Sequence, residues 1–188
     1  MNDFYTEEEL KQLGLKNYGK DVFISKKASI YGAENISIGN NVRIDDFCIL
    51  SGNIEIGNFV HISAYSALYG KYGIKIGNFC GISPRSILFS VSDDFSGNYM
   101  ISPMVPEKYT NVSGGVIILN NYVQIGANSI IMPSVEFFEG AVCGAFSFVK
   151  ENCEPWSVYA GIPAKKIKSR NNKAKNYGKE IINSMHNI

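Results

Sequence analysis

A large apolar side chain returns every six positions through most of residues 24–153, and a small residue commonly follows four positions after it. This period matches neither an amphipathic helix, which repeats about every 3.6 residues, nor a single ordinary strand. It is typical of a hexapeptide β-helix, in which each hexad supplies one short flat strand and one corner. The sequence therefore predicts an all-β solenoid of parallel strands. The periodic residues are Ile24, Ile30, Ile38, Ile44, Leu50, Ile56, Ile62, Leu68, Ile76, Ile82, Leu88, Leu119, Ile125, Ile131, Phe137, Cys143 and Val149.

Three hexads close one triangular coil, so each coil should use about 18 residues and stack on the next at roughly 4.8 Å. The large residue of each hexad then fills the narrow prism, and the residue four positions later must be small. A Phe at Ser66 or Ser129 should not fit. Four asparagines recur in register at one corner, and we expect them to adopt the left-handed backbone conformation there, which Asn tolerates. The aromatics that follow three of them should stack in an outer column. These corner residues are Asn40, Asn58, Asn78 and Asn121, with Phe59, Phe79 and Tyr122.

One long interruption breaks the repeat, and shorter elements flank it. The interruption, residues 90–115, reads SVSDDFSGNYMISPMVPEKYTNVSGG, and its aromatic and apolar residues favour an ordered loop over a site. Thr6 and Glu9 form a capping box for a short helix that should end near Gly14. Residues 173–188 could form a frayed helix. The predicted domains are a helical cap at 1–18, the β-helix at 19–154 with loop 90–115 extruded, and a C-terminal segment at 155–188 that packs on it.

Composition sets broad limits on function. A length of 188 residues with 45% hydrophobic content predicts one domain with an adequate core, and a formal charge of +1 gives no electrostatic footprint for nucleic acid. The chain shows neither a signal peptide nor an apolar run long enough to span a bilayer, so we expect no membrane insertion and a cytoplasmic protein. The four cysteines lack metal-ligand spacing and are expected to be reduced core residues. The basic cluster Lys165, Lys166, Lys168 and Arg170 is either a solvated tail or an anion site.

Several motifs near the end of the repeat point to a known family. Residues 125–127 read IGA, residues 139–142 read EGAV, residues 144–145 read GA and residues 160–165 read AGIPAK. With Pro133 between the first two, this order resembles the hexapeptide-repeat acyltransferases of the left-handed β-helix class. The resemblance covers nearly the whole chain, and the closest branch is that of sugar acetyltransferases in surface polysaccharide and nucleotide-sugar pathways. The left hand of the coil is implied by the resemblance, because parallel crossovers are right-handed in nearly all other folds.

The resemblance also implies an assembly and a cofactor. It implies a homotrimer with clefts between neighbouring prisms, acetyl-CoA lying along the coil axis, and no metal. The pantetheine arm would follow the backbone near Ala127, and the 3′-phosphate end would lie near a lysine. Ala127 and Ala145 occupy equivalent positions in consecutive coils, although both could simply be corner residues. The cofactor-binding residues that the resemblance implies are Ala127, Gly144, Ala145, Pro163, Ala164 and Lys165.

The catalytic inventory is short. Acyl transfer to a hydroxyl uses a base whose pKa lies near the working pH, and His is the commonest choice. The only histidines are His61 and His186, and His186 is the third residue from the end. His61 precedes Ile62 and should lie in the groove of Ala127, two coils or roughly 10 Å away. Three roles stay open for it: general base, orientation of the acceptor, or a structural corner residue.

The acidic residues of the loop are the other candidates for the site. Many galactoside and maltose acetyltransferases carry their catalytic His in the extruded loop, and this loop has none. Asp93 and Asp94 stand where the loop could cross the cleft, so one of them could bind the acceptor or orient His61. Both could equally belong to an ordinary loop turn. A sugar amine needs only to be neutral before it attacks, so the choice between hydroxyl and amine stays open.

Two histidines cannot supply the three zinc ligands of a γ-class carbonic anhydrase, and two threonines cannot form an ice-binding array. The sequence therefore predicts an acetyl-CoA-dependent sugar or nucleotide-sugar acetyltransferase, an enzyme of polysaccharide biosynthesis that acts on a small sugar acceptor. We expect direct transfer, because no Cys or Ser is paired with a base by a visible motif. A non-catalytic trimeric scaffold or sugar-binding protein is the alternative.

Overall fold

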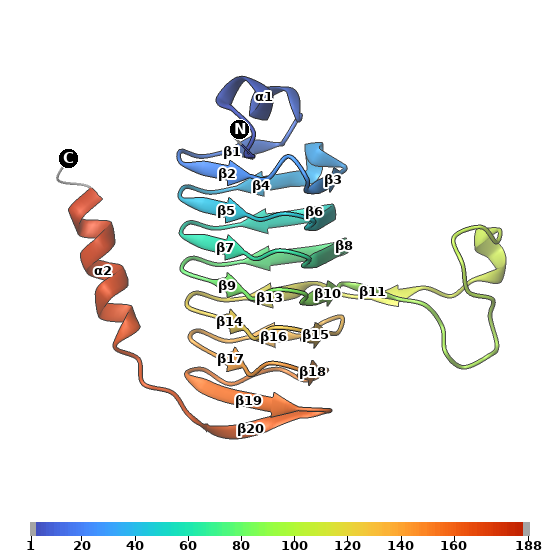
Figure 1. The fold of residues 1–188 in the computed structure, drawn as a ribbon. Coiled ribbons are helices and arrows are strands. Elements are labelled where there is room, and N and C mark those ends of the chain that lie inside the picture. The colour runs from blue at the N-terminus through green and yellow to red at the C-terminus, as the bar shows by residue number, and fades with distance from the viewer. Residues whose placement is uncertain (1–2, 186–188) are drawn as a thin grey trace.

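The computed structural model describes residues 3–185, which form a parallel β-helix whose coils stack one on another (Figure 1). The strands of each coil lie on three faces. The first face contains β2 (Val22–Ile24), β5 (Val42–Ile44), β7 (Val60–Ile62), β9 (Gly81–Ile82), β14 (Gln124–Ile125) and β17 (Val142–Cys143), and it ends in the antiparallel pair β19 (Ser157–Gly161) and β20 (Ala164–Ser169). The second face contains β3 (Ser29–Tyr31), β10 (Ile87–Phe89), β15 (Ile130–Ile131) and β18 (Phe148–Val149). The third contains β1 (Asn17–Tyr18), β4 (Ile36–Ile38), β13 (Ile117–Leu119) and β16 (Glu136–Phe137).

Two long strands connect the second and third faces. β6 (Ile49–Ile56) and β8 (Ala67–Ile76) run through the corner, so that their first halves pair on the second face and their second halves on the third. The predicted parallel β-helix of hexapeptide repeats is thereby confirmed, and consecutive coils are joined in register along every face.

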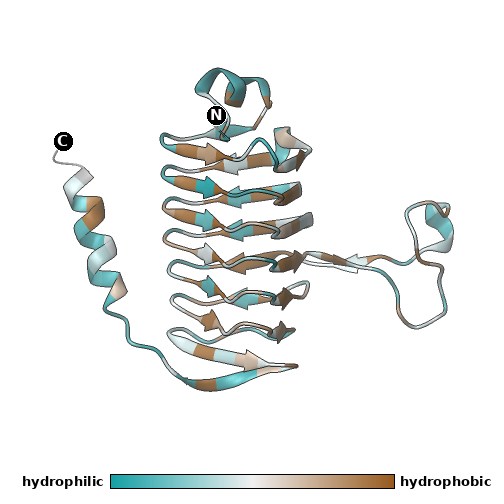
Figure 2. Cartoon of the chain, in the orientation of Figure 1, coloured by the Kyte–Doolittle hydropathy of each residue, from teal (hydrophilic) through white to brown (hydrophobic). Residues whose placement is uncertain are grey.

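The interior of the prism is filled as the repeat predicts. Ile44, Ile62 and Ile125 of the first face are fully buried, and burial of each such side chain stabilises the fold by about 1.5–3 kcal/mol. Figure 2 shows apolar residues recurring coil after coil along the strands. The small residues have no room to grow, since Ser66 and Ser129 are also fully buried and their hydroxyls donate to backbone carbonyls of the neighbouring turn.

The asparagine corner forms for a different reason from the one expected. The left-handed residues there are Asn41, Phe59, Phe79 and Tyr122, each of which directly follows one of the four asparagines. The prediction that the asparagines themselves adopt this conformation is therefore wrong. Their side chains instead form a ladder between coils, in which the backbone N–H of one Asn donates to the Oδ1 of the next at 2.7–2.8 Å; the acceptors are Asn58, Asn78 and Asn121.

The aromatic residues at this corner stack as predicted. The rings of Phe59 and Phe79 lie 4.7 Å apart and nearly parallel, and those of Phe79 and Tyr122 lie 5.2 Å apart. Trp156 extends the column at 5.9 Å from Tyr122. Because the left-handed conformation turns each ring outward, one ring per coil can lie over the next along the corner.

The interruption of the repeat projects from the corner between the second and third faces (Figure 1). β11 (Val91–Ser92) and β12 (Ser113–Gly114) form its antiparallel stem, and a 3₁₀ turn covers Glu107–Tyr109. The stem is anchored by the buried Ser90, whose hydroxyl donates to the Tyr69 carbonyl and accepts from the Tyr72 N–H at 2.8 and 2.9 Å. A side chain at Gly114 would collide with the Tyr72 ring and the Ser90 carbonyl.

Helices lie at both ends of the chain. α1 (Glu7–Gln12) begins at the expected capping box, in which the Thr6 N–H donates to Glu9 at 2.8 Å and the Glu9 N–H donates to Thr6 at 3.3 Å. A short 3₁₀ turn covers Ala33–Asn35 in the first coil. α2 (Ala174–Met185) stands beside the prism in Figure 1. No helix between residues 3 and 185 is long and apolar enough to cross a membrane. His186 lies outside the described residues.

Candidate active site

A groove of about 570 Å³ runs across the first face from the asparagine corner to the corner that leads to the second face. Gly81 lies in register between His61 and Gln124 in consecutive coils. A Cβ at Gly81 would collide with the side-chain amide of Gln124, so the missing side chain makes the room in which this amide lies. Its lining includes Arg43, His61, Cys80, Gly81, Ser83 and Gln124.

His61 is held by a carboxylate from the preceding coil. Its Nε2 lies 2.7 Å from Oδ2 of Asp45, and Oδ1 of Asp45 accepts a 2.6 Å hydrogen bond from Nε of Arg43. The side chain of Asp45 is 16% exposed, whereas that of His61 is 50% exposed. Partial burial raises the pKa of Asp45, but the hydrogen bonds from Arg43 and His61 outweigh it and leave that pKa below its usual value. Asp45 is therefore ionised at neutral pH.

Ser83 and Gln124 form a second polar pair that the sequence analysis missed. Nε2 of Gln124 donates to Oγ of Ser83 at 2.9 Å, with the Gln124 amide lying against Gly81. Neither residue belongs to a recognisable motif. Their position follows only from strand register, because Gln124 pairs with Gly81 across the gap left by residues 90–115.

The thiol in this groove is unsuited to nucleophilic catalysis. Cys80 is buried, and its Sγ donates to the carbonyl of Asn120 at 3.1 Å. Burial raises the pKa of Cys80 to about 12, so the reactive thiolate is scarce at neutral pH. All four cysteines, Cys48, Cys80, Cys143 and Cys153, are free and buried.

The alanines of the sequence motifs lie on the same side of the prism. Ile125 pairs with Cys143, and the N–H of Phe146 donates to the carbonyl of Ala127 at 2.8 Å, so Ala127 and Ala145 occupy consecutive coils. Ala145 is exposed and Ala127 is partly exposed. Register through Gly81 places the coil of Ala127 two coils beyond His61, or about 10 Å along the stack.

The last motif forms the hairpin that ends the first face. Gly161 pairs with Ala164, which places Pro163 in the turn between β19 and β20. Lys165 is exposed and lies 3.7 Å from Glu151. Gly144 connects the hairpin to the coil above it, since its N–H donates to the carbonyl of Tyr159 at 2.8 Å.

The two loop aspartates lie elsewhere. Asp93 faces a concave surface of about 1220 Å³ between the loop and the second face, whose lining includes Tyr69, Phe89 and Lys71. Within residues 3–185 the carboxylate of Asp93 has no hydrogen-bond or ion-pair partner. Within one chain His61 and Asp93 therefore line separate concavities, and the loop projects away from the prism (Figure 1).

Asp94 orders its own loop. Its Oδ1 accepts from the N–H and hydroxyl of Ser96 at 2.8 and 2.6 Å, and its Oδ2 accepts from Asn111 at 3.2 Å. These bonds, that from the Ser96 hydroxyl above all, lower the pKa of Asp94. The carboxylate is thus occupied by the loop itself, whereas that of Asp93 is open to a ligand.

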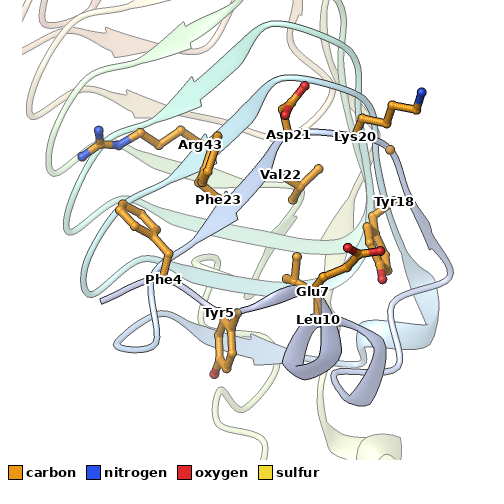
Figure 3. A pocket seen from close by; sticks show the side chains of 11 residues that line it. Phe4, Tyr5, Glu7, Leu10, Tyr18, Lys20, Asp21, Val22, Phe23 and Arg43 are labelled. Carbon is orange, nitrogen blue, oxygen red and sulfur yellow. The ribbon is translucent and has the colours of Figure 1, made fainter. Parts of the chain in front are cut away.

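A further pocket, of about 830 Å³, lies at the N-terminal end of the first face (Figure 3). Its walls come from the first coils and from the segment around α1, and they include Phe4, Tyr18 and Phe23. Arg43 lines both this pocket and the groove of His61. No cluster of three or more His, Cys, Asp or Glu side chains suited to a metal ion occurs among the described residues.

Comparisons with known proteins agree with this architecture. Residues 35–70 match the family model described as bacterial transferase hexapeptide (six repeats). The dTDP-4-amino-4,6-dideoxy-D-glucose acyltransferase of Escherichia coli is 47% identical over 173 residues, which are 90% of each chain. A serine variant of AntD, an N-acyltransferase from Bacillus cereus, was crystallised with dTDP-4-amino-4,6-dideoxyglucose and coenzyme A; it is 51% identical, with 98% of this chain and 99% of that chain covered and a TM-score of 0.95.

AntD has also been crystallised with dTDP and 3-hydroxybutyryl-CoA, in a structure that covers 99% of this chain with 52% identity and a TM-score of 0.96. A galactoside acetyltransferase in complex with coenzyme A is 18% identical with a TM-score of 0.58, which supports the fold alone. The identity and coverage of the E. coli and B. cereus proteins are far above what a shared fold requires. The chain therefore belongs to the family of hexapeptide-repeat acyltransferases.

Proposed function

We propose that the protein transfers the acyl group of an acyl-CoA to the 4-amine of dTDP-4-amino-4,6-dideoxyglucose or a closely similar dTDP-amino sugar. The observation that carries this proposal is the near-full-length similarity to AntD, which was crystallised with that sugar nucleotide and coenzyme A. This similarity narrows the predicted acceptor group, which the sequence analysis left as a hydroxyl or an amine, to an amine. It also widens the acyl group beyond acetyl, because AntD was crystallised with 3-hydroxybutyryl-CoA.

Transfer to an amine sets a modest demand on the protein. The amine must lose its extra proton before its nitrogen attacks the thioester carbonyl. The C–N bond then forms, a tetrahedral oxyanion develops, the C–S bond breaks, and the CoA thiolate leaves and takes up a proton. A protein base therefore needs to accept one proton from the ammonium or from the intermediate, and a backbone N–H in the groove stabilises the oxyanion.

His61 and Asp93 are the residues best placed for these tasks. Asp93 offers an unpaired carboxylate, which suits an ammonium group, and His61 offers one ring nitrogen that is not engaged by Asp45. The two line different concavities of one chain, so a single site can use both only if they come from neighbouring chains. We therefore propose a homotrimer in which the loop of one subunit closes over the groove of the next. Asp94 supports the loop.

We propose that acyl-CoA follows the first face from the groove toward the C-terminal hairpin. The exposed backbone near Ala127, Gly144 and Ala145 offers hydrogen bonds to the pantetheine arm, with the thioester beside Ser83 and Gln124. The turn at Pro163 and Ala164, with Lys165 beside it, offers positive charge to the 3′-phosphate. The predicted basic cluster is only partly free, because Arg170 donates to the carbonyls of Tyr122 and Gly140 at 2.9 Å.

Supply of the substrates points to the cell interior. Nucleotide sugars and acyl-CoA are cytoplasmic metabolites, and four free cysteines suit a reducing compartment. A role in surface polysaccharide biosynthesis is supported by similarity to a protein of E. coli K12 named as a lipopolysaccharide biosynthesis O-acetyl transferase, which is 26% identical over 162 residues.

The test is thiol release from acetyl-CoA and 3-hydroxybutyryl-CoA in the presence of dTDP-4-amino-4,6-dideoxyglucose. Its matched acceptor is dTDP-6-deoxyglucose, which carries a hydroxyl where the amino sugar carries the amine. The proposal predicts turnover with the amine and little with the hydroxyl. Turnover with the hydroxyl alone would overturn the amine assignment. Binding of the sugar nucleotide without thiol release from either thioester would favour the scaffold or sugar-binding alternative.

A further inference from the structure

Asp45 is the residue that contacts the imidazole of His61. We infer that Asp45, itself held by Arg43, is a positioning residue that fixes the imidazole with its proton on Nε2 and leaves Nδ1 as the basic nitrogen available to the acceptor. The inference rests on the proposed role of His61 in acyl transfer. It adds two residues, Asp45 and Arg43, that lie outside the sequence motifs.

Strand register creates the arrangement. Arg43 and His61 are paired neighbours on β5 and β7, and both side chains point outward from the first face. Asp45 lies at the corner just after β5, where it can reach both. Each of its oxygens therefore has one partner, Nε of Arg43 at 2.6 Å and Nε2 of His61 at 2.7 Å. Rotation of the carboxylate would break both contacts at once.

Arg43 is itself fixed from the other side. Its guanidinium lies over the ring of Phe4, with 5.2 Å from Cζ to the ring centroid, and Phe4 meets Phe23 edge to face at 6.0 Å. Figure 3 shows Arg43 beside Phe4 and Phe23 at the edge of the N-terminal pocket. The aromatic contact and the hydrogen bond to Asp45 hold a long side chain that would otherwise be mobile.

Donor and acceptor chemistry then decides the tautomer. An ionised carboxylate has no proton to donate, so a neutral His61 must carry its proton on Nε2 to make this hydrogen bond. Among the described residues Nδ1 has no partner, so it keeps a free lone pair on a side chain that lines the groove. Asp45 is the charged group that contacts His61, Arg43 is its register neighbour on β5, and the thiol of Cys80 is the other titratable group that lines the groove.

Asp46 provides a matched control one residue away. Its Oδ1 accepts from the hydroxyl of Ser25 at 2.5 Å, and its Oδ2 pairs with Lys27 at 2.8 Å. It therefore makes the same kinds of contact as Asp45, on the same corner, without touching His61. A general loss of negative charge or of corner stability should appear in both D45N and D46N, whereas control of the imidazole should appear only in D45N.

The first arm of the experiment is ¹⁵N NMR of the imidazole rings in the full-length protein. The chain has two histidines, so the variant H186N assigns His61 directly. The neutral imidazole of His61 in the wild type should show a protonated Nε2 and an unprotonated Nδ1. In D45N the amide oxygen of Asn should keep its hydrogen bond from Arg43, so the amide NH₂ should face Nε2 of His61. An NH₂ group donates, which favours the tautomer with an unprotonated Nε2 and a proton on Nδ1. D46N should match the wild type.

The second arm is kinetic. D45N should lower kcat/KM for the amino-sugar acceptor by about tenfold or more, with D46N near the wild type. In an H61A background D45N should cause no further loss, because its effect passes through His61. A wild-type proton on Nδ1, unchanged kcat/KM in D45N, or equal additional loss in the H61A background would each overturn the inference. NMR reports the tautomer of His61 in the wild type whether or not a given acceptor turns over. If the proposed acceptor is wrong, thiol release fails while the predicted tautomer is still seen, whereas a proton on Nδ1 shows that the inference itself is wrong.

Discussion

The contrast between Asp93 and Asp94 yields a sharp prediction, because adjacent residues of one type have opposite environments. Asp94 accepts three hydrogen bonds from Ser96 and Asn111, while Asp93 has an unengaged carboxylate on the concave side of the loop. If Asp93 holds the acceptor ammonium, D93N replaces a charged acceptor with the neutral amide oxygen of Asn and so weakens one hydrogen bond of the substrate complex.

The magnitude follows from the worth of such a bond. A hydrogen bond to a charged group contributes about 1.5–3 kcal/mol, and each 1.4 kcal/mol is tenfold in an equilibrium. A charged acceptor makes a hydrogen bond about twice as strong as a neutral one does, so D93N should cost about half of this energy. It should therefore lower kcat/KM for the amino-sugar acceptor by about 3- to 12-fold, with KM for acyl-CoA changed by less than about twofold. The assay is thiol release at saturating acyl-CoA and varied acceptor.

D94N is the control for this prediction. An Asn at that position keeps one oxygen for Ser96, so D94N should loosen the loop and lower kcat/KM less than D93N does. Limited proteolysis of residues 90–115 should detect the looser loop in D94N and leave D93N like the wild type. A larger kinetic loss in D94N than in D93N would refute the assignment, as would wild-type kinetics in D93N.

Three further predictions concern the fold and the groove. Phe137 is fully buried and Phe146 is 67% exposed. F137A should therefore lower the free energy of unfolding by about 3–5 kcal/mol and F146A by less than about 0.5 kcal/mol, measured by urea denaturation at one fixed protein concentration. A loss below about 1 kcal/mol in F137A would contradict the packing. G81A should push the Gln124 amide away from Ser83 and lower kcat/KM with little loss of stability, and unchanged kinetics would show that the Gln124–Ser83 pair is not used. Folding lowers the pKa of Asp45, so the stability that Asp45 contributes should be present above its unfolded pKa of about 3.9 and should disappear as the pH falls through its folded pKa. The free energies of unfolding of the wild type and D45N should therefore differ at pH 6 and converge at acid pH. A difference that stays constant with pH would refute the linkage.

The repeat alone predicts most of the fold, because a six-residue period leaves few alternatives for a buried side chain such as Ile62 or Phe137. The small interior positions and the aromatic column follow from the same register. At the asparagine corner, the tendency of Asn to adopt the left-handed backbone conformation did not predict which residue adopts it. Asn tolerates the left-handed conformation, yet inter-coil hydrogen bonds to Asn58 and Asn78 use the side chain instead, and Phe59 and Phe79 take the strained position.

The candidate site was less predictable. His61 could be singled out because the chain has so few histidines, but its partner Asp45 lies 16 residues earlier and meets it only through the coil spacing. Ser83 and Gln124 are separated by the loop insertion, so their contact depends on how many residues leave the prism at 90–115. Asp93 and Asp94 are alike in sequence, and only the hydrogen bonds of the folded loop distinguish them.

The most direct test of a site shared between two subunits is complementation between H61A and D93N. Each variant alone should be impaired. In mixed trimers formed by co-expression, a groove from a D93N chain can meet a loop from an H61A chain, which restores both wild-type residues at about a quarter of the sites if assembly is random. The shared site predicts recovery of amine acylation in the mixture above either variant alone. A mixture no more active than its better parent would contradict it.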